Sequence, residues 1–145
     1  MKRSSLYILA AALVAAFTLA VLPTQQPVSA DSDSKKAIAE AMEVLAGNYR
    51  QIRRNLRDPS KNGETAELLA EMIKASVDSK AHLPETASTD DLKNSYRVVM
   101  NKLIVALANA ENAALTGDSD KLKEYVMEAN SVKGEGHELF IPEDE

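Results

Sequence analysis

The chain of 145 residues contains no cysteine. This absence excludes disulfide bonds, cysteine-ligated zinc, iron–sulfur clusters, thiol catalysis and covalent Cys-x-x-Cys-His haem attachment. The fold must therefore be stabilised by packing alone, or by packing together with a cofactor. The sequence also shows no Ser-His-Asp set, no glycine-rich phosphate loop and no isolated pair of core carboxylates, so we do not expect an enzyme.

No segment shows the alternation of a β-strand, and we find no low-complexity stretch or internal repeat. Apolar residues instead recur every three or four positions in four segments, about residues 34–57, 64–82, 90–116 and 119–140. Four helices with short connections predict an all-α fold, an antiparallel up-down-up-down four-helix bundle.

The stripes that we expect to form the core can be read from the same spacing. The clearest stripes lie in the first and third segments, and the second is weaker. Their members are Ile38, Met42, Leu45, Tyr49, Ile52 and Leu56; Leu68, Leu69, Met72, Ile73, Ser76 and Val77; Leu92, Tyr96, Val99, Leu103, Leu107 and Ala110; and Leu122, Val126, Ala129, Lys133, Gly136 or His137, and Phe140.

Capping and turn residues predict where the helices begin and end. We expect Asp33 or Ser34, Ser88 or Thr89, and Ser119-Asp120 to mark helix starts, with Asn62-Gly63 as a turn. Three prolines and one glycine are expected at the ends, in Asp58-Pro59, Leu83-Pro84, Gly117 and Pro142.

Residues 1–30 resemble a secretory signal peptide. Lys2 and Arg3 precede an apolar run from Ile8 to Leu22, and Val28-Ser29-Ala30 has the small residues of a cleavage site. The run is shorter than the ~18–20 residues of a membrane span, although an uncleaved anchor is the alternative. We therefore predict a periplasmic protein whose mature domain spans residues 31–145.

The predicted mature domain is acidic. Without Lys2 and Arg3, 15 basic residues face 22 acidic ones, which gives a net charge of −7. Such a surface argues against nucleic acid and anionic membrane as partners. Arg50, Arg53, Arg54 and Arg57 form a basic strip, which is either a solvated face paired with acidic residues or a docking patch.

The last predicted turn, residues 131–140, has the sequence S-V-K-G-E-G-H-E-L-F and contains His137, one of two histidines. Gly134 and Gly136 cost a helix about 1 kcal/mol each relative to alanine, and they leave space beside His137. In an up-down bundle the end of the fourth helix lies beside the start of the first, where Met42 belongs to the core stripe. Histidine and methionine are a known axial pair for haem iron, although each residue also has an ordinary packing or capping role.

Residues 41–45, 48–52, 91–117 and 133–140 resemble the cytochrome b562 family and, more distantly, cytochrome c′. The resemblance covers nearly all of the predicted mature chain, and it implies that Met42 is the sixth and His137 the fifth haem ligand, 95 residues apart. Lys133 and Gly136 stand where cytochrome c′ has its two attachment cysteines, so the resemblance implies non-covalent haem b. Lys133 could then approach a haem propionate, or it is an ordinary surface lysine.

The resemblance implies a monomeric carrier of single electrons that serves another redox protein. His82 is expected at the same end of the bundle and is an alternative ligand, and Tyr96 is placed to line the pocket. The alternative function is a haem-free helical bundle that binds a protein or acts as a scaffold, which the glycine-weakened last turn and the acidic tail would suit.

Overall fold

The computed structural model of the protein describes residues 30–141, and side-chain surroundings from Ser32 onward. Residues 1–29 of the predicted signal segment lie outside this range, and so does Pro142, which was expected to end the fourth helix. The described chain forms four α-helices, α1 (Ala30–Asn55), α2 (Asn62–Lys80), α3 (Asp90–Thr116) and α4 (Ser119–Phe140), with one short 3-10 helix, η1 (Pro59–Lys61). This arrangement confirms the predicted all-α four-helix bundle.

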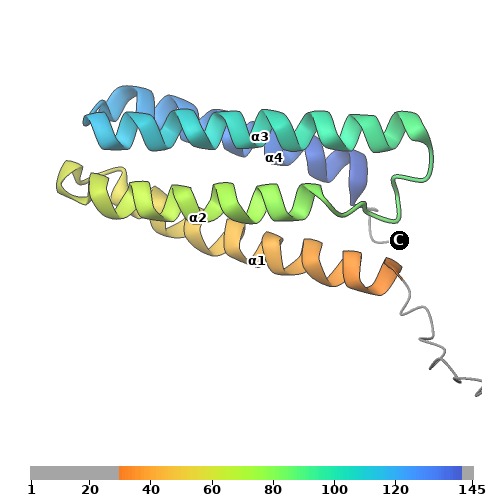
Figure 1. The fold of residues 1–145 in the computed structure, drawn as a ribbon. Coiled ribbons are helices and arrows are strands. Elements are labelled where there is room, and N and C mark those ends of the chain that lie inside the picture. The colour runs from red at the N-terminus through yellow and green to blue at the C-terminus, as the bar shows by residue number, and fades with distance from the viewer. Residues whose placement is uncertain (1–29, 142–145) are drawn as a thin grey trace, which may run out of the picture.

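The helices run alternately up and down, and α1 with α2 lies below α3 with α4 in Figure 1. Close backbone packing joins α1 to α2, α2 to α3, and α3 to α4. The pair α1 and α4 lacks comparable backbone contact, and α1 leans away from α2 towards its N-terminal end. One end of the bundle is therefore more loosely closed than the other.

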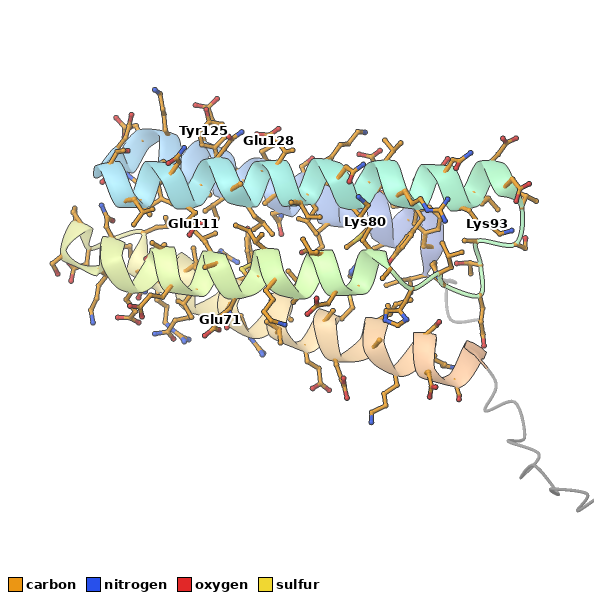
Figure 2. All side chains as sticks on the ribbon, viewed as in Figure 1. Glu71, Lys80, Lys93, Glu111, Tyr125 and Glu128 are labelled. Carbon is orange, nitrogen blue, oxygen red and sulfur yellow. The ribbon has the colours of Figure 1, made fainter. Side chains whose placement is uncertain are left out.

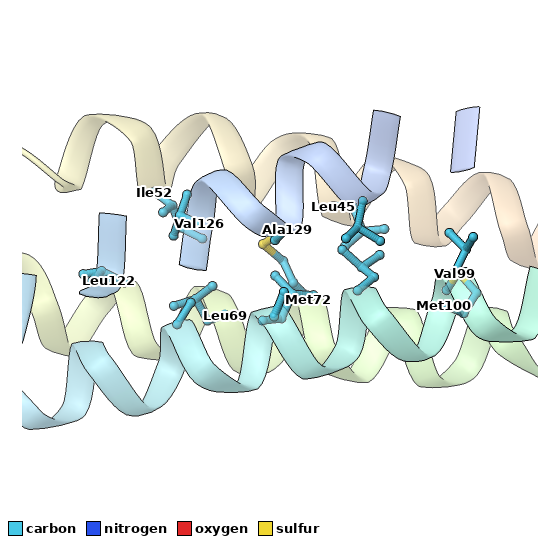
Figure 3. Packing of buried hydrophobic residues seen from close by; sticks show 14 of the residues in the cluster. Leu45, Ile52, Leu69, Met72, Val99, Met100, Leu122, Val126 and Ala129 are labelled. Atoms are coloured by element: carbon cyan, nitrogen blue, oxygen red, sulfur yellow. The ribbon is translucent and has the colours of Figure 1, made fainter. Parts of the chain in front are cut away.

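The core follows the predicted stripes with few exceptions. Buried side chains from all four helices meet along the bundle axis (Figure 3), among them Leu45, Ile52, Leu69, Met72, Val99, Leu103, Leu107, Leu122, Val126 and Ala129. Acidic side chains such as Glu71 and Glu128 project outward (Figure 2). Val77 was expected in the core but is half exposed, because its position on α2 turns away from the neighbouring helices.

Two predicted helix ends are confirmed by their capping contacts. The Thr89 hydroxyl accepts a hydrogen bond from the Leu92 amide at 3.2 Å, and acidic Asp90 and Asp91 follow at the positive end of α3. Gly117 ends α3 with φ of 75°, a left-handed conformation that glycine adopts without steric cost. The fourth helix starts at Ser119 as expected, with Asp118 as its capping residue.

Two predicted boundaries were wrong. Asp33 and Ser34 do not cap α1, because the helix already begins at Ala30 and both residues lie within it. Gly63 is not in a turn but in the first turn of α2, since Asp58 and Pro59 make the reversal instead. The Asp58 carboxylate accepts a hydrogen bond from the Ser60 amide at 3.0 Å, and Pro59 supplies a fixed φ at the start of η1.

Candidate haem site at one end of the bundle

Met42 and His137 both line one cavity, which lies between α1, α3 and α4 at the end where α1 begins and α4 ends. The volume of this cavity is about 80 Å³. Its walls are mostly apolar and are formed by Ile38, Ala41, Met42, Leu45, Ser79, Pro84, Tyr96, Val99, Met100, Leu103, Val132, Lys133, Gly136, His137, Phe140 and Ile141. The bundle topology thus brings the two predicted ligand residues to one space, although 95 positions separate them in the sequence.

The His137 imidazole has a free nitrogen inside the protein. Its Nε2 atom is buried and has no hydrogen-bond partner among the described residues. Burial lowers the pKa of His137, and the positive charge of Lys133 lowers it further. The ring is thereby favoured in its neutral form, the form in which an imidazole nitrogen can donate electrons to a metal. A buried polar atom without a partner is costly, and a ligand bound at this nitrogen would remove that cost.

Met42 is half-buried on α1 at the position that the periodic pattern predicts. A methionine side chain is unbranched and polarizable, so it can fill an irregular space or reach towards a metal without moving the backbone. Thioether and imidazole together are a donor set that suits haem iron. The described residues include no group of three or more His, Cys, Asp or Glu side chains close enough to hold a metal ion.

Lys133 also lines the cavity, one helical turn before His137, and is half-buried. No carboxylate pairs with its ammonium group among the described residues. A half-buried cation without a counter-charge can receive an anionic group of a ligand, while its methylene groups cover the apolar wall.

The two glycines of the last turn have different surroundings. A Cβ atom at Gly136 would lie 3.2 Å from Cγ1 of Val99, so the absence of a side chain lets α4 approach α3 closely beside the cavity. A Cβ atom at Gly134 would contact nothing within 4 Å. The prediction that both glycines make room beside His137 was therefore right for Gly136 only, because Gly134 is exposed to solvent.

A network of side chains holds the turn that carries His137. The Phe140 ring meets the Tyr96 ring edge to face, with centroids 5.4 Å apart and an interplanar angle of 88°. The Tyr96 hydroxyl donates to the Ser79 carbonyl at 3.2 Å, and burial raises the pKa of Tyr96, which keeps that donor protonated. The Thr86 hydroxyl donates to the Phe140 carbonyl at 2.8 Å. The loop between α2 and α3 is thus fastened to the end of α4.

The position of Tyr96 early in the third predicted helix placed it at this end of the bundle, and its presence in the cavity wall is confirmed. The periodic pattern missed Pro84 and Ile141, which line the cavity, and Thr86, which lies outside it and holds the end of α4, because periodicity carries no information about loop geometry. Thr86 lies in a polar segment after Leu83-Pro84. The only signal in the sequence was its hydroxyl group, which can form hydrogen bonds with backbone groups near a helix end.

His82 lies near the same end but outside the cavity. Its Nδ1 atom is 3.5 Å from the Ser34 hydroxyl, so its recorded partner is the first part of α1. It is not among the residues that line the space with Met42 and His137. The structure therefore gives His82 a contact between α1 and the end of α2, and nothing in that contact favours it as an alternative ligand.

The residues at the cavity fit a haem in chemistry, and the space must widen to admit one. An apolar cavity of about 150 Å³ accommodates a molecule the size of benzene. The cavity of about 80 Å³ is therefore too small for the haem macrocycle. An adjoining hollow of about 420 Å³ shares Ile38, Met42, Pro84, Phe140 and Ile141 with the cavity. Two of the shared residues, Ile38 and Met42, belong to α1, and α1 has little backbone contact with α4, so a displacement of α1 is the change that we expect to widen the space.

A helical bundle with a histidine and a methionine facing one apolar cavity has the features of the four-helix-bundle cytochromes. The family described as Cytochrome b562 matches residues 37–140, and the chain belongs to this family. Membership of this family supports a role in electron transfer, with b-type haem as the cofactor, rather than an enzymatic role. No curated protein and no solved structure was found to match the chain. Within the part of the chain that the structure describes, no helix is long and apolar enough to cross a membrane.

Proposed function

We propose that the protein is an exported b-type cytochrome that carries single electrons, with haem held non-covalently between Met42 and His137. The observation that carries this proposal is the buried Nε2 atom of His137, which lacks a hydrogen-bond partner and belongs to a residue lining the same cavity as Met42. Membership of the cytochrome b562 family supports the cofactor class.

In this proposal His137 supplies a neutral imidazole and Met42 a thioether as the two axial ligands. A haem held there would supply a one-electron iron couple, and methionine–histidine ligation raises its reduction potential. The low pKa of His137 keeps protons from competing for Nε2 at neutral pH. The network of Tyr96, Phe140 and Thr86 fixes the turn from which His137 projects.

The remaining residues of the site orient the group and exclude water. Lys133 is suited to pair with a propionate, because it is half-buried at the cavity and no carboxylate neutralises it. Val99, Leu103 and other apolar side chains keep the surroundings at low dielectric. A low-dielectric environment reduces the solvent reorganisation that accompanies a change of charge, which suits a carrier that binds and releases electrons without other chemistry.

The proposal includes export to the periplasm, based on the charge and apolar pattern of residues 1–30. It also includes a redox protein as partner and a monomeric state.

The ligand pair is tested by His137→Ala and Met42→Ala, with optical spectra recorded on the oxidised and reduced protein after haem is added. We expect both variants to lose the sharp low-spin bands and to bind haem at least about a hundredfold more weakly, because even outer contacts of metal ligands contribute ten- to hundredfold. The matched controls are His82→Ala, outside the cavity, and Met127→Ala, whose side chain is 65% exposed. Wild-type spectra in both ligand variants would rule out this pair.

A further inference from the structure

Four exposed arginines, three in the second half of α1 and one just beyond its end, have no carboxylate partner among the described residues. Arg50, Arg53, Arg54 and Arg57 are exposed, and they follow one another at steps of three, one and three residues, so they share one face of the helical path. The Leu56 amide still bonds to the Ile52 carbonyl at 2.9 Å, which carries the helical course beyond Asn55 towards Arg57. We call these four residues the arginine stripe.

The lack of an ion pair within the described chain is shared by Lys35, Lys80, Arg97 and Lys133, and the arginine stripe differs from these in its grouping on one face of a helical path. Every ion pair in residues 32–141 uses a lysine, and none uses an arginine. Arg54 donates to the neutral side chain of Gln51, and the other three arginines have no recorded partner. The expectation that acidic residues of the same chain pair with this strip was wrong.

The two acidic residues that follow the stripe in sequence, Asp58 and Glu64, are engaged elsewhere. The Asp58 carboxylate accepts from the Ser60 hydroxyl at 2.7 Å and from the Ser60 amide at 3.0 Å. The Glu64 carboxylate accepts from Gln51 at 2.9 Å and from Lys61 at 3.0 Å, and these hydrogen bonds lower the pKa of Glu64 to about 2. The positive charge of the stripe therefore remains free for a partner outside the chain.

Grouping the arginines is unfavourable within the protein itself. Like charges three and four residues apart repel each other on a helix, and the stripe contains four such pairs. Arg53 and Arg54 lie in the last turn of α1, where the negative end of the helix dipole offsets part of the repulsion. Arg50 lies before that turn, where the effect of the helix dipole is weaker. An external counter-charge would offset this internal cost.

We infer that the arginine stripe binds a cluster of carboxylates on the surface of an acidic partner protein. Guanidinium groups match carboxylates in shape and bind them through two parallel hydrogen bonds. The stripe spans about 10 Å of helix, roughly one Debye length at physiological salt, so its field is local. The chain as a whole carries a net charge of −5, which would repel an extended polyanion such as a membrane or a nucleic acid but tolerates a compact cluster.

The stripe lies at the opposite end of the bundle from the last turn of α4 (Figure 1). Arg57 is about 22 Å along the helical path from Met42. A partner bound there leaves the cavity end free, so the stripe would hold the protein on its partner while the other end meets a second molecule. The inference does not depend on haem, and its test uses the protein without added cofactor.

The probe is a helical peptide with four glutamates on one face, spaced i, i+3, i+4 and i+7, and its isomer with the same residues spread around the helix. We expect the one-faced peptide to bind the protein more tightly than its isomer. Replacing all four arginines by glutamine should weaken that binding about tenfold or more, because four charge-assisted contacts are lost. The matched control replaces the exposed lysines Lys35, Lys36, Lys121 and Lys123 by glutamine, with the same change in net charge, and should bind like the wild type.

Three outcomes would overturn the inference. Equal binding of the two peptides would mean that spacing is not recognised. Equal losses in the arginine and lysine variants would mean that only net charge matters. Tighter binding to phosphatidylglycerol vesicles than to the one-faced peptide, lost in the arginine variant alone, would make the occupant a lipid surface. Circular dichroism of both variants establishes that each remains folded.

Discussion

The two ends of the bundle are built differently. At the end where α1 meets α2, Ile52 and Leu69 are fully buried, and Leu107 and Leu122 are nearly so. At the other end Met42 and His137 are only half-buried, and they line a cavity. Among the described residues, each end has one buried side-chain nitrogen without a partner, Asn55 Nδ2 at the packed end and His137 Nε2 at the other, but only the latter belongs to a residue that lines this cavity. A bundle selected only for stability would close both ends in the same way. This contrast is what we expect if one end gives up packing to hold the proposed haem.

The packed end should be far more sensitive to truncation of a side chain. Leu107→Ala is expected to lower the free energy of unfolding by about 2–5 kcal/mol, because it opens a cavity where the core cannot collapse. Ile38→Ala at the cavity end should cost less than half of that, since Ile38 is already half-exposed beside empty space. Urea denaturation of the haem-free protein measures both. Equal losses of unfolding free energy in the two variants would contradict the difference in packing between the two ends.

The local stability of the turn that carries His137 should depend on the hydroxyl group of Thr86 in the neighbouring loop. Thr86→Val removes the hydrogen bond to the Phe140 carbonyl and is expected to cost about 1 kcal/mol. Amide exchange should become faster in residues 137–141 in particular. Thr116→Val is the matched control, because Thr116 donates to the Asn112 carbonyl at 2.8 Å at the packed end. If exchange near His137 were unchanged in Thr86→Val, this network would not hold the turn.

Alanine substitutions at the two glycines of the last turn should distinguish the effect of helix propensity on stability from the effect of packing between α4 and α3. Gly134→Ala is expected to stabilise the protein by up to about 1 kcal/mol, since alanine is the better helix former and the new methyl group meets open space. Gly136→Ala should gain less or destabilise, because its methyl group would lie 3.2 Å from Val99. Thermal unfolding of the two variants measures the difference. A larger gain at Gly136 would contradict the close approach of α4 to α3.

The smallest expected effect is a pH dependence from His137. Because burial lowers its pKa in the folded protein, the unfolded chain binds the proton first as the pH falls through about 6.5. The stability that this group contributes is thus complete above that pH, and it is lost as the pH falls towards the lower pKa of the folded state. His137→Gln should reduce the decline in unfolding free energy between pH 7.5 and 5. An identical decline in wild type and His137→Gln would contradict the lowered pKa.

Much of this architecture could be predicted from residue spacing. The three-four periodicity identified four helices and most buried residues, and Thr89 and Gly117 identified two helix ends, because these signals are local. The start of α1 could not be predicted, since Asp33 and Ser34 are compatible with both a cap and a helix interior. The exposure of Val77 also depends on how α2 is rotated against its neighbours, which no local pattern fixes.

The site was predictable in part. Bundle topology alone was enough to bring Met42 and His137 to the same end, and the family resemblance pointed to the same pair. The different roles of Gly134 and Gly136 were not predictable, because they depend on which of them faces Val99. The contribution of Thr86 required the path of a loop. The size of the cavity required the actual separation of α1 from α4.

The most direct test of the central claim is an optical titration of the protein with haem, in the oxidised and the reduced form. If Met42 and His137 supply two strong axial ligands, binding will saturate at one haem per chain, and reduction will give sharp low-spin α and β bands. An absence of saturable binding would contradict the claim, and the protein would then be a haem-free bundle that has kept the fold of its family.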